Sequence, residues 1–183
     1  MNTPARLLIT AILAVFSAGL ASAWAADPET EAVAAIRQRY ATINENLARY
    51  TTVRKELAGF STEGGDLTAY FEGTAIRKIA TRHQGETGRS FEEYYYLDDG
   101  FMFVYRKEDT YSEPMSGKVV QTREARFYFE DGELVRWLDE NGKRVSRKDS
   151  QWAEQQEQYF NNSKDLQAAA RSEKTTIEAG LRY

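Results

Sequence analysis

Residues 91–106, FEEYYYLDDGFMFVYR, decide the fold of this chain. Two runs rich in aromatic residues flank the pair Asp99-Gly100. Aromatic side chains favour the pleated, half-buried surface of a β-strand. Asp-Gly between two such runs favours a tight hairpin, because both central residues of a type I′ turn need positive φ. We therefore predict two antiparallel strands, at 90–97 and 101–108, that are joined by a two-residue turn.

The predicted register gives this hairpin an aromatic surface. Tyr96 lies opposite Phe103 and Tyr94 lies opposite Tyr105, all on one face, and the other face is also apolar. Helices can cover one face, and the other is then either a second packing surface or an apolar groove for a ligand. In the second case these four residues are candidate ligand-binding residues, since the polar tips of tyrosines suit a hydrated surface.

Similar turn signals recur along the chain and predict the rest of a meander. Asp131-Gly132 fits either a two-residue loop or a three-residue loop with a bulge. Asn141-Gly142 fits a two-residue loop that pairs Leu138 with Val145. The predicted strands lie at 66–71, 75–82, 90–97, 101–108, 118–129, 133–139 and 143–147.

An amphipathic helix is predicted on each side of this meander. Apolar residues at positions 33, 36, 40, 43 and 47 follow helical spacing, whereas Arg37 lies on the opposite face. Trp152, Tyr159 and Leu166 lie near one face of a second helix. We predict an α+β fold: an antiparallel β-meander of about seven strands, flat or curled into a half-barrel, flanked by an N-terminal and a C-terminal helix. Residues 26–183 form one domain: the first helix and its connection at 26–65, the meander at 66–147, and the last helix and tail at 148–183.

Residues 1–25 have the three-part layout of a secretory signal peptide. A basic N-terminus precedes an apolar run over positions 7–20, and small residues follow at Ala21-Ser22-Ala23 and at Ala25. The run is shorter than the roughly 20 residues that a membrane-spanning helix needs. We expect cleavage after Ala23 or Ala25, a mature chain without a membrane span, and a periplasmic or secreted location.

Composition excludes several classes of protein. The 183 residues include 24 Lys+Arg, 28 Asp+Glu, one His and no Cys, with a formal net charge of −4. The absence of cysteine excludes disulfides, thiolate zinc sites and cysteine nucleophiles, and the single histidine excludes metal motifs that need two histidines. The acidic balance argues against nucleic-acid binding, and no sequence fingerprint predicts a cofactor or a metal.

The richest polar cluster is the segment RHQGETGR, residues 82–89, between two predicted strands. In a functional interpretation, His83 is a general base oriented by Glu86, and Arg82 or Arg89 holds an anion. In a structural interpretation, a glycine-containing polar loop normally has such residues. Because both interpretations stay open, Arg82, His83 and Arg89 join the candidate ligand-binding residues.

The sequence favours a non-catalytic binding or interaction module of the periplasm that uses an aromatic sheet face. Its partner is another envelope protein or a small apolar ligand. One alternative is a small periplasmic enzyme or enzyme inhibitor that uses the Arg82–Arg89 loop. Another is a structural component of the envelope that acts through its terminal helices. No motif in the sequence predicts a catalytic residue.

Overall fold

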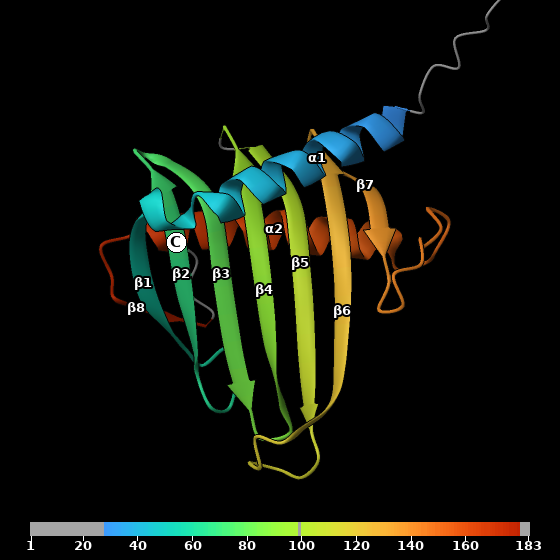
Figure 1. Ribbon diagram of the computed structural model, residues 1–183. Helices are drawn as coiled ribbons and strands as arrows, with labels where there is room; N and C mark the ends of the chain where they lie inside the picture. Colours follow the sequence, from blue (N-terminus) through green and yellow to red (C-terminus); the bar gives the residue numbers. More distant parts are fainter. Residues whose placement is uncertain (1–27, 99, 180–183) are drawn as a thin grey trace, which may run out of the picture.

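The computed structural model describes residues 28–98 and 100–179 (Figure 1). Within these ranges the chain forms two α-helices, one short 3-10 helix and eight strands, which confirms the α+β class. The elements are α1 (Pro28–Glu45), η1 (Leu47–Arg49), β1 (Thr51–Ala58), β2 (Gly65–Glu72), β3 (Ala75–Gly85), β4 (Gly88–Leu97), β5 (Gly100–Tyr111), β6 (Val119–Glu130), β7 (Glu133–Leu138), α2 (Trp152–Arg171) and β8 (Thr176–Glu178). The predicted signal peptide lies outside the described residues. In the described ranges, neither helix is long and apolar enough to span a bilayer.

The described strands belong to one open sheet. Its order is β7-β6-β5-β4-β3-β2-β1-β8, so each strand from β1 to β7 pairs with its neighbour along the chain. These pairs are antiparallel, whereas β8 runs parallel to β1. The predicted antiparallel meander between two helices is therefore confirmed, with eight described strands and no closure into a barrel.

Residues 51–58 form β1, where we predicted the end of the first helix or its connection. Helix α1 ends at Glu45, and the next residue, Asn46, donates from its side-chain amide to the carbonyl of Thr42 at 2.8 Å. Such a local bond offers the chain an alternative to further helix. The following segment alternates in burial and places Leu57 in the core, so it pairs with β2 as a strand.

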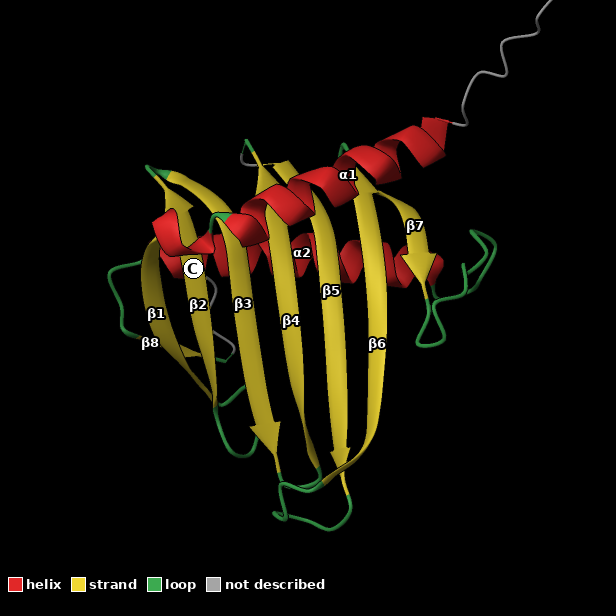
Figure 2. Ribbon diagram, in the orientation of Figure 1, coloured by secondary structure: helices red, strands yellow, loops and turns green. Residues whose placement is uncertain are grey.

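Helices α1 and α2 cover opposite faces of the sheet (Figure 2), and each face builds its own core. The large side chains buried on the α2 side include Tyr94, Tyr96, Phe127, Phe129, Trp137, Trp152 and Tyr159. Those buried on the α1 side include Val33, Ile36, Ile43, Tyr95, Met102, Phe103 and Tyr128. The aromatic residues on both strand faces are explained by this arrangement, because each face packs against a helix where the helix crosses it.

The turn of the β4–β5 hairpin lies one residue earlier than predicted. Leu97 pairs with Gly100, whereas the prediction placed Gly100 in the loop. Asp98 takes the left-handed conformation, with φ 48°, which short acidic side chains tolerate. A bulge between Tyr95 and Tyr96 then shifts the pairing again.

This shift separates the four aromatic residues that we predicted on one face. Tyr95 pairs with Phe103, and both belong to the α1-side core. Tyr94 and Tyr96 belong to the α2-side core, whereas Tyr105 packs against the α1-side core with Phe103. The predicted shared face is therefore wrong, since a one-residue change of register moves a side chain to the opposite face.

The last predicted strand, 143–147, is reduced to a single bridge between Leu138 and Arg144. The loop at Gly142 holds three residues rather than two, and Gly142 takes φ 71°. A three-residue hairpin loop needs a left-handed residue at this position, which glycine supplies without strain. The predicted pairing of Leu138 with Val145 is therefore wrong.

Candidate functional site

The seven residues predicted from the sequence are divided between the two faces of the sheet. Tyr94, Tyr96 and His83 lie on the α2 side. Tyr94 and Tyr96 are both 0 % exposed. The Tyr94 hydroxyl bonds to the Glu92 carboxylate at 2.6 Å, and the Tyr96 hydroxyl bonds to Ser163 of α2 at 3.3 Å. Both tyrosines are therefore parts of the core rather than of an open surface.

The other four predicted residues, Arg82, Arg89, Phe103 and Tyr105, lie on the α1 side of the sheet. Helix α1 crosses this face near one end of the strands, and the face continues beyond the helix over β3 to β6 (Figure 1). The strand pairing places side chains in rows across this part of the face. One row is Thr68, Ala80, Glu93, Tyr105 and Arg126, and the next is Asp66, Arg82, Phe91, Lys107 and Glu124.

A cavity of about 480 Å³ lies between α1 and strands β5 and β6. We name it the α1–sheet cavity. Its lining residues come from these three elements: Ile36, Arg37 and Tyr40 from α1, Phe103 and Tyr105 from β5, and Glu124, Arg126 and Tyr128 from β6. Two of the predicted residues, Phe103 and Tyr105, are thus brought together with side chains from a distant helix.

Four of the eight residues that line the α1–sheet cavity are aromatic. The Phe103 ring centroid lies 5.4 Å from that of Tyr40 and 4.9 Å from that of Tyr128. Tyr40 is 37 % exposed, so this wall is open to solvent on the helix side. Tyr105 is half-buried. Such a wall offers aromatic faces and edges to a flat apolar group.

The polar groups of this cavity contact one another. Arg126 Nη2 donates to Glu124 Oε2 at 2.9 Å, and its guanidinium lies 5.4 Å from the centroid of the Tyr105 ring. Burial and the Glu124 carboxylate raise the pKa of Tyr105, which keeps the phenol protonated. Arg37 Nε donates to the Tyr128 hydroxyl at 3.4 Å.

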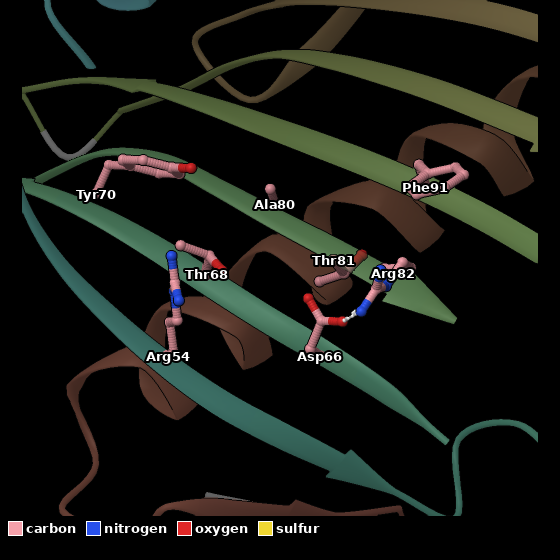
Figure 3. A pocket seen from close by; sticks show the side chains of 8 residues that line it. All are labelled: Arg54, Asp66, Thr68, Tyr70, Ala80, Thr81, Arg82 and Phe91. Atoms are coloured by element: carbon pink, nitrogen blue, oxygen red, sulfur yellow. Dashed lines mark hydrogen bonds and ion pairs between the residues drawn. The ribbon is translucent and has the colours of Figure 1, made fainter. Parts of the chain in front are cut away.

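A second depression, which we name the sheet hollow, lies on the same face (Figure 3). It has a volume of about 500 Å³ and is lined by Arg54, Asp66, Thr68, Tyr70, Ala80, Thr81, Arg82 and Phe91. Thr68 and Ala80 pair across β2 and β3. Their side chains are small, whereas most of the other side chains that line the hollow are long. Arg82 Nη2 lies 2.6 Å from Asp66 Oδ1, so this predicted anion holder already has a carboxylate partner.

Arg89 also has a carboxylate partner within the protein. Its Nε donates to Asp109 Oδ2 at 2.9 Å, and Thr122 donates to the other carboxylate oxygen at 2.7 Å. Burial opposes ionisation of Asp109, but the hydrogen bonds from Thr122 and Arg89 outweigh it and lower its pKa. The observed contacts of Arg89 are therefore those of a structural ion pair between β4 and β5.

The segment that we interpreted as an Arg82–Arg89 loop is a tight hairpin. Strands β3 and β4 extend to Gly85 and Gly88, which pair with each other and leave a two-residue turn. His83 faces the α2 side, where its ring centroid lies 6.1 Å from that of Phe60. Its buried Nδ1 has no hydrogen-bond partner in the described part of the chain, and no hydrogen bond between His83 and Glu86 is found there.

We expect His83 to make the protein less stable in mild acid. Burial lowers its pKa from 6.5, against an opposing effect of Asp66. The folded chain therefore binds this proton more weakly than the unfolded chain, and stability falls as pH drops from 6.5 towards the folded pKa. Urea unfolding of wild type and His83→Gln, at about pH 7 and about pH 5, measures this. The wild type should lose more stability than the variant, and equal losses would contradict the prediction.

Sequence reasoning missed Arg37 and Tyr40 as site residues. Arg37 was assigned to the polar face of the helix, next to the buried Ile36. Its contact with Tyr128 joins residues 91 positions apart, which no local pattern indicates. The sequence signal that indicates Arg37 is its place at the border of the apolar stripe of the helix. Residues at that border reach the edge of the packed surface.

In the described residues, no three His, Asp or Glu side chains are grouped as a metal site would need. No protein-family model matches the chain, and no curated protein sequence or solved structure has significant similarity to it.

Proposed function

We propose that this chain is an exported, non-catalytic binding protein that takes a small ligand with an aromatic or apolar body into the α1–sheet cavity. One observation carries the proposal: Tyr40, Phe103, Tyr105 and Tyr128 line a cavity of about 480 Å³ between the helix and the sheet. Ligand sites are typically concave, largely apolar and furnished with a few polar groups.

The arrangement of polar groups supports binding more than catalysis. The Glu124 carboxylate is paired with Arg126, and the raised pKa of Tyr105 opposes its use as a base near neutral pH. The alternative enzyme or inhibitor site at 82–89 has less support, because Arg82 and Arg89 are paired with carboxylates and the buried Nδ1 of His83 has no hydrogen-bond partner among the described residues. Export is supported by the layout of residues 1–25, from which a periplasmic or secreted location follows.

The proposal is tested with phenylnaphthylamine, an uncharged aromatic dye that fluoresces in apolar surroundings. Purified protein should bind it saturably, and Tyr105→Ala should weaken binding about tenfold, because it removes one aromatic wall. The matched control is Phe91→Ala, another half-buried aromatic residue of the same face that lines the sheet hollow instead. Absence of saturable binding to the wild type, or equal losses in both variants, would contradict the proposed site.

A further inference from the structure

We infer that the ligand of the α1–sheet cavity carries an anionic group, such as a carboxylate on an aromatic body, and that Arg37 binds this group. The inference rests on the proposed function and adds the chemical class of the ligand. Three observations support it: the charge of the cavity lining, the absence of a carboxylate partner for Arg37 among the described residues, and the position of its guanidinium beside Tyr128.

The lining of the cavity is positive although the chain is acidic. Arg37 and Arg126 contribute two positive charges and Glu124 contributes one negative charge, which leaves a net +1. The whole chain has a formal net charge of −4. A positive cavity in a negative protein favours anions over cations among aromatic ligands of one size.

Arg37 has no ion-pair partner among the described residues, whereas the other arginine of the cavity has one. Arg126 lies 2.9 Å from Glu124, so its charge is compensated. Arg37 contacts the Tyr128 hydroxyl and ring, and neither contact involves a carboxylate. The charge at the cavity that remains to be matched is therefore that of Arg37.

The contacts of Arg37, which is exposed, place its guanidinium beside Tyr128. Its Nε donates to the Tyr128 hydroxyl at 3.4 Å, and Cζ lies 5.6 Å from the centroid of the Tyr128 ring. Neither contact uses the two Nη groups, which carry four of the five N–H donors of the side chain. A carboxylate binds guanidinium nitrogens through two parallel hydrogen bonds, so these Nη groups can bind an anionic group of a ligand.

The test compares two dyes that share a naphthalene body and an aryl amine. Anilinonaphthalene sulfonate is an anion, and phenylnaphthylamine is neutral. Wild-type protein should bind the anionic dye more tightly than the neutral one. Arg37→Gln should weaken binding of the anionic dye about tenfold, since a hydrogen bond to a charged group is lost, and should leave binding of the neutral dye nearly unchanged.

Two further variants separate Arg37 from a general effect of charge. Arg37→Lys keeps the charge without the planar fork and should recover part of the affinity for the anionic dye. Arg54→Gln removes an exposed arginine that lines the sheet hollow and likewise has no ion-pair partner among the described residues, so it should bind both dyes as wild type does. Thermal melts of all variants check that each one is folded.

The possible failures have different meanings. If neither dye binds, the proposed function falls and the inference falls with it. If the neutral dye binds but the anionic dye does not bind more tightly, or Arg37→Gln has no effect, the inference is wrong while the proposed function stands. If Arg54→Gln rather than Arg37→Gln weakens binding of the anionic dye, the anion binds in the sheet hollow and Arg37 is not its site.

Discussion

Tyr96→Ala is expected to lower the free energy of unfolding by about 3–5 kcal/mol, the range for replacing a buried large aromatic ring by alanine. Tyr96 is 0 % exposed, its ring centroid lies 6.1 Å from that of Phe101, and its hydroxyl bonds to Ser163 of α2. The substitution leaves a cavity between the sheet and α2, which surrounding side chains fill only in part. Urea titration followed by circular dichroism measures the change.

Two variants serve as controls for Tyr96→Ala. Tyr96→Phe removes the bond to Ser163 but keeps the ring, so we expect a loss of about 1 kcal/mol. Tyr105→Ala changes a half-buried tyrosine on the other face, where we expect a smaller loss than for Tyr96→Ala. If Tyr96→Ala unfolds at the same urea concentration as wild type, its ring does not contribute to the core. Loss of ligand binding in Tyr96→Ala would reflect loss of the fold rather than of a ligand contact.

The α+β meander was predictable because its signals are local. Helical spacing of apolar residues indicated α1, and Val33, Ile36 and Ile43 of that pattern are buried. Strand β1 was missed because neither Gly nor Pro separates it from the helix. Strand β8 has three residues and pairs with β1 from a distant part of the chain, so no local pattern identifies it.

Register was less predictable than the strands themselves. At Asp131-Gly132 both residues take positive φ and Glu130 pairs with Glu133, so the two-residue alternative is the one that forms. At the β4–β5 hairpin the turn lies one residue earlier in the chain than predicted. The segment Leu97–Gly100 offers two residue pairs for the loop, Asp98-Asp99 and Asp99-Gly100, and the choice decides which aromatic residues face which helix.

The candidate site was predictable only in part, for the same reason. Phe103 and Tyr105 were found because aromatic residues in strands mark a packed or binding surface. Tyr94 and Tyr96 look identical to them in sequence but lie on the other face, beneath α2. Arg37 and Tyr40 enter the site only through packing of α1 on the sheet, which is a tertiary contact. The site is thus assembled from contacts that sequence periodicity alone does not encode.

The second substitution with a large expected effect on stability is at Gly88, the first residue of β4 after its turn from β3. A Cβ at this position would overlap the backbone carbonyl oxygen of Asp109 on β5. Backbone atoms in the middle of a sheet move only if the strand pair separates, and Asp109 is also fixed by its ion pair with Arg89. Gly88→Ala is therefore expected to cost about 3 kcal/mol of stability, at the upper end of overpacking substitutions.

Gly85 is the matched control for Gly88, because the two glycines pair across the same turn. A Cβ on Gly85 would lie 3.6 Å from its nearest neighbours, which is ordinary van der Waals contact. Gly85→Ala should therefore change stability by less than about 1 kcal/mol. Neither glycine has positive φ, so the difference between the two variants measures the close approach of β4 to β5 and not backbone strain. Equal melting temperatures for the two variants would mean that the strands are not held this close in solution, since the steric clash at Gly88 would then be relieved at no cost.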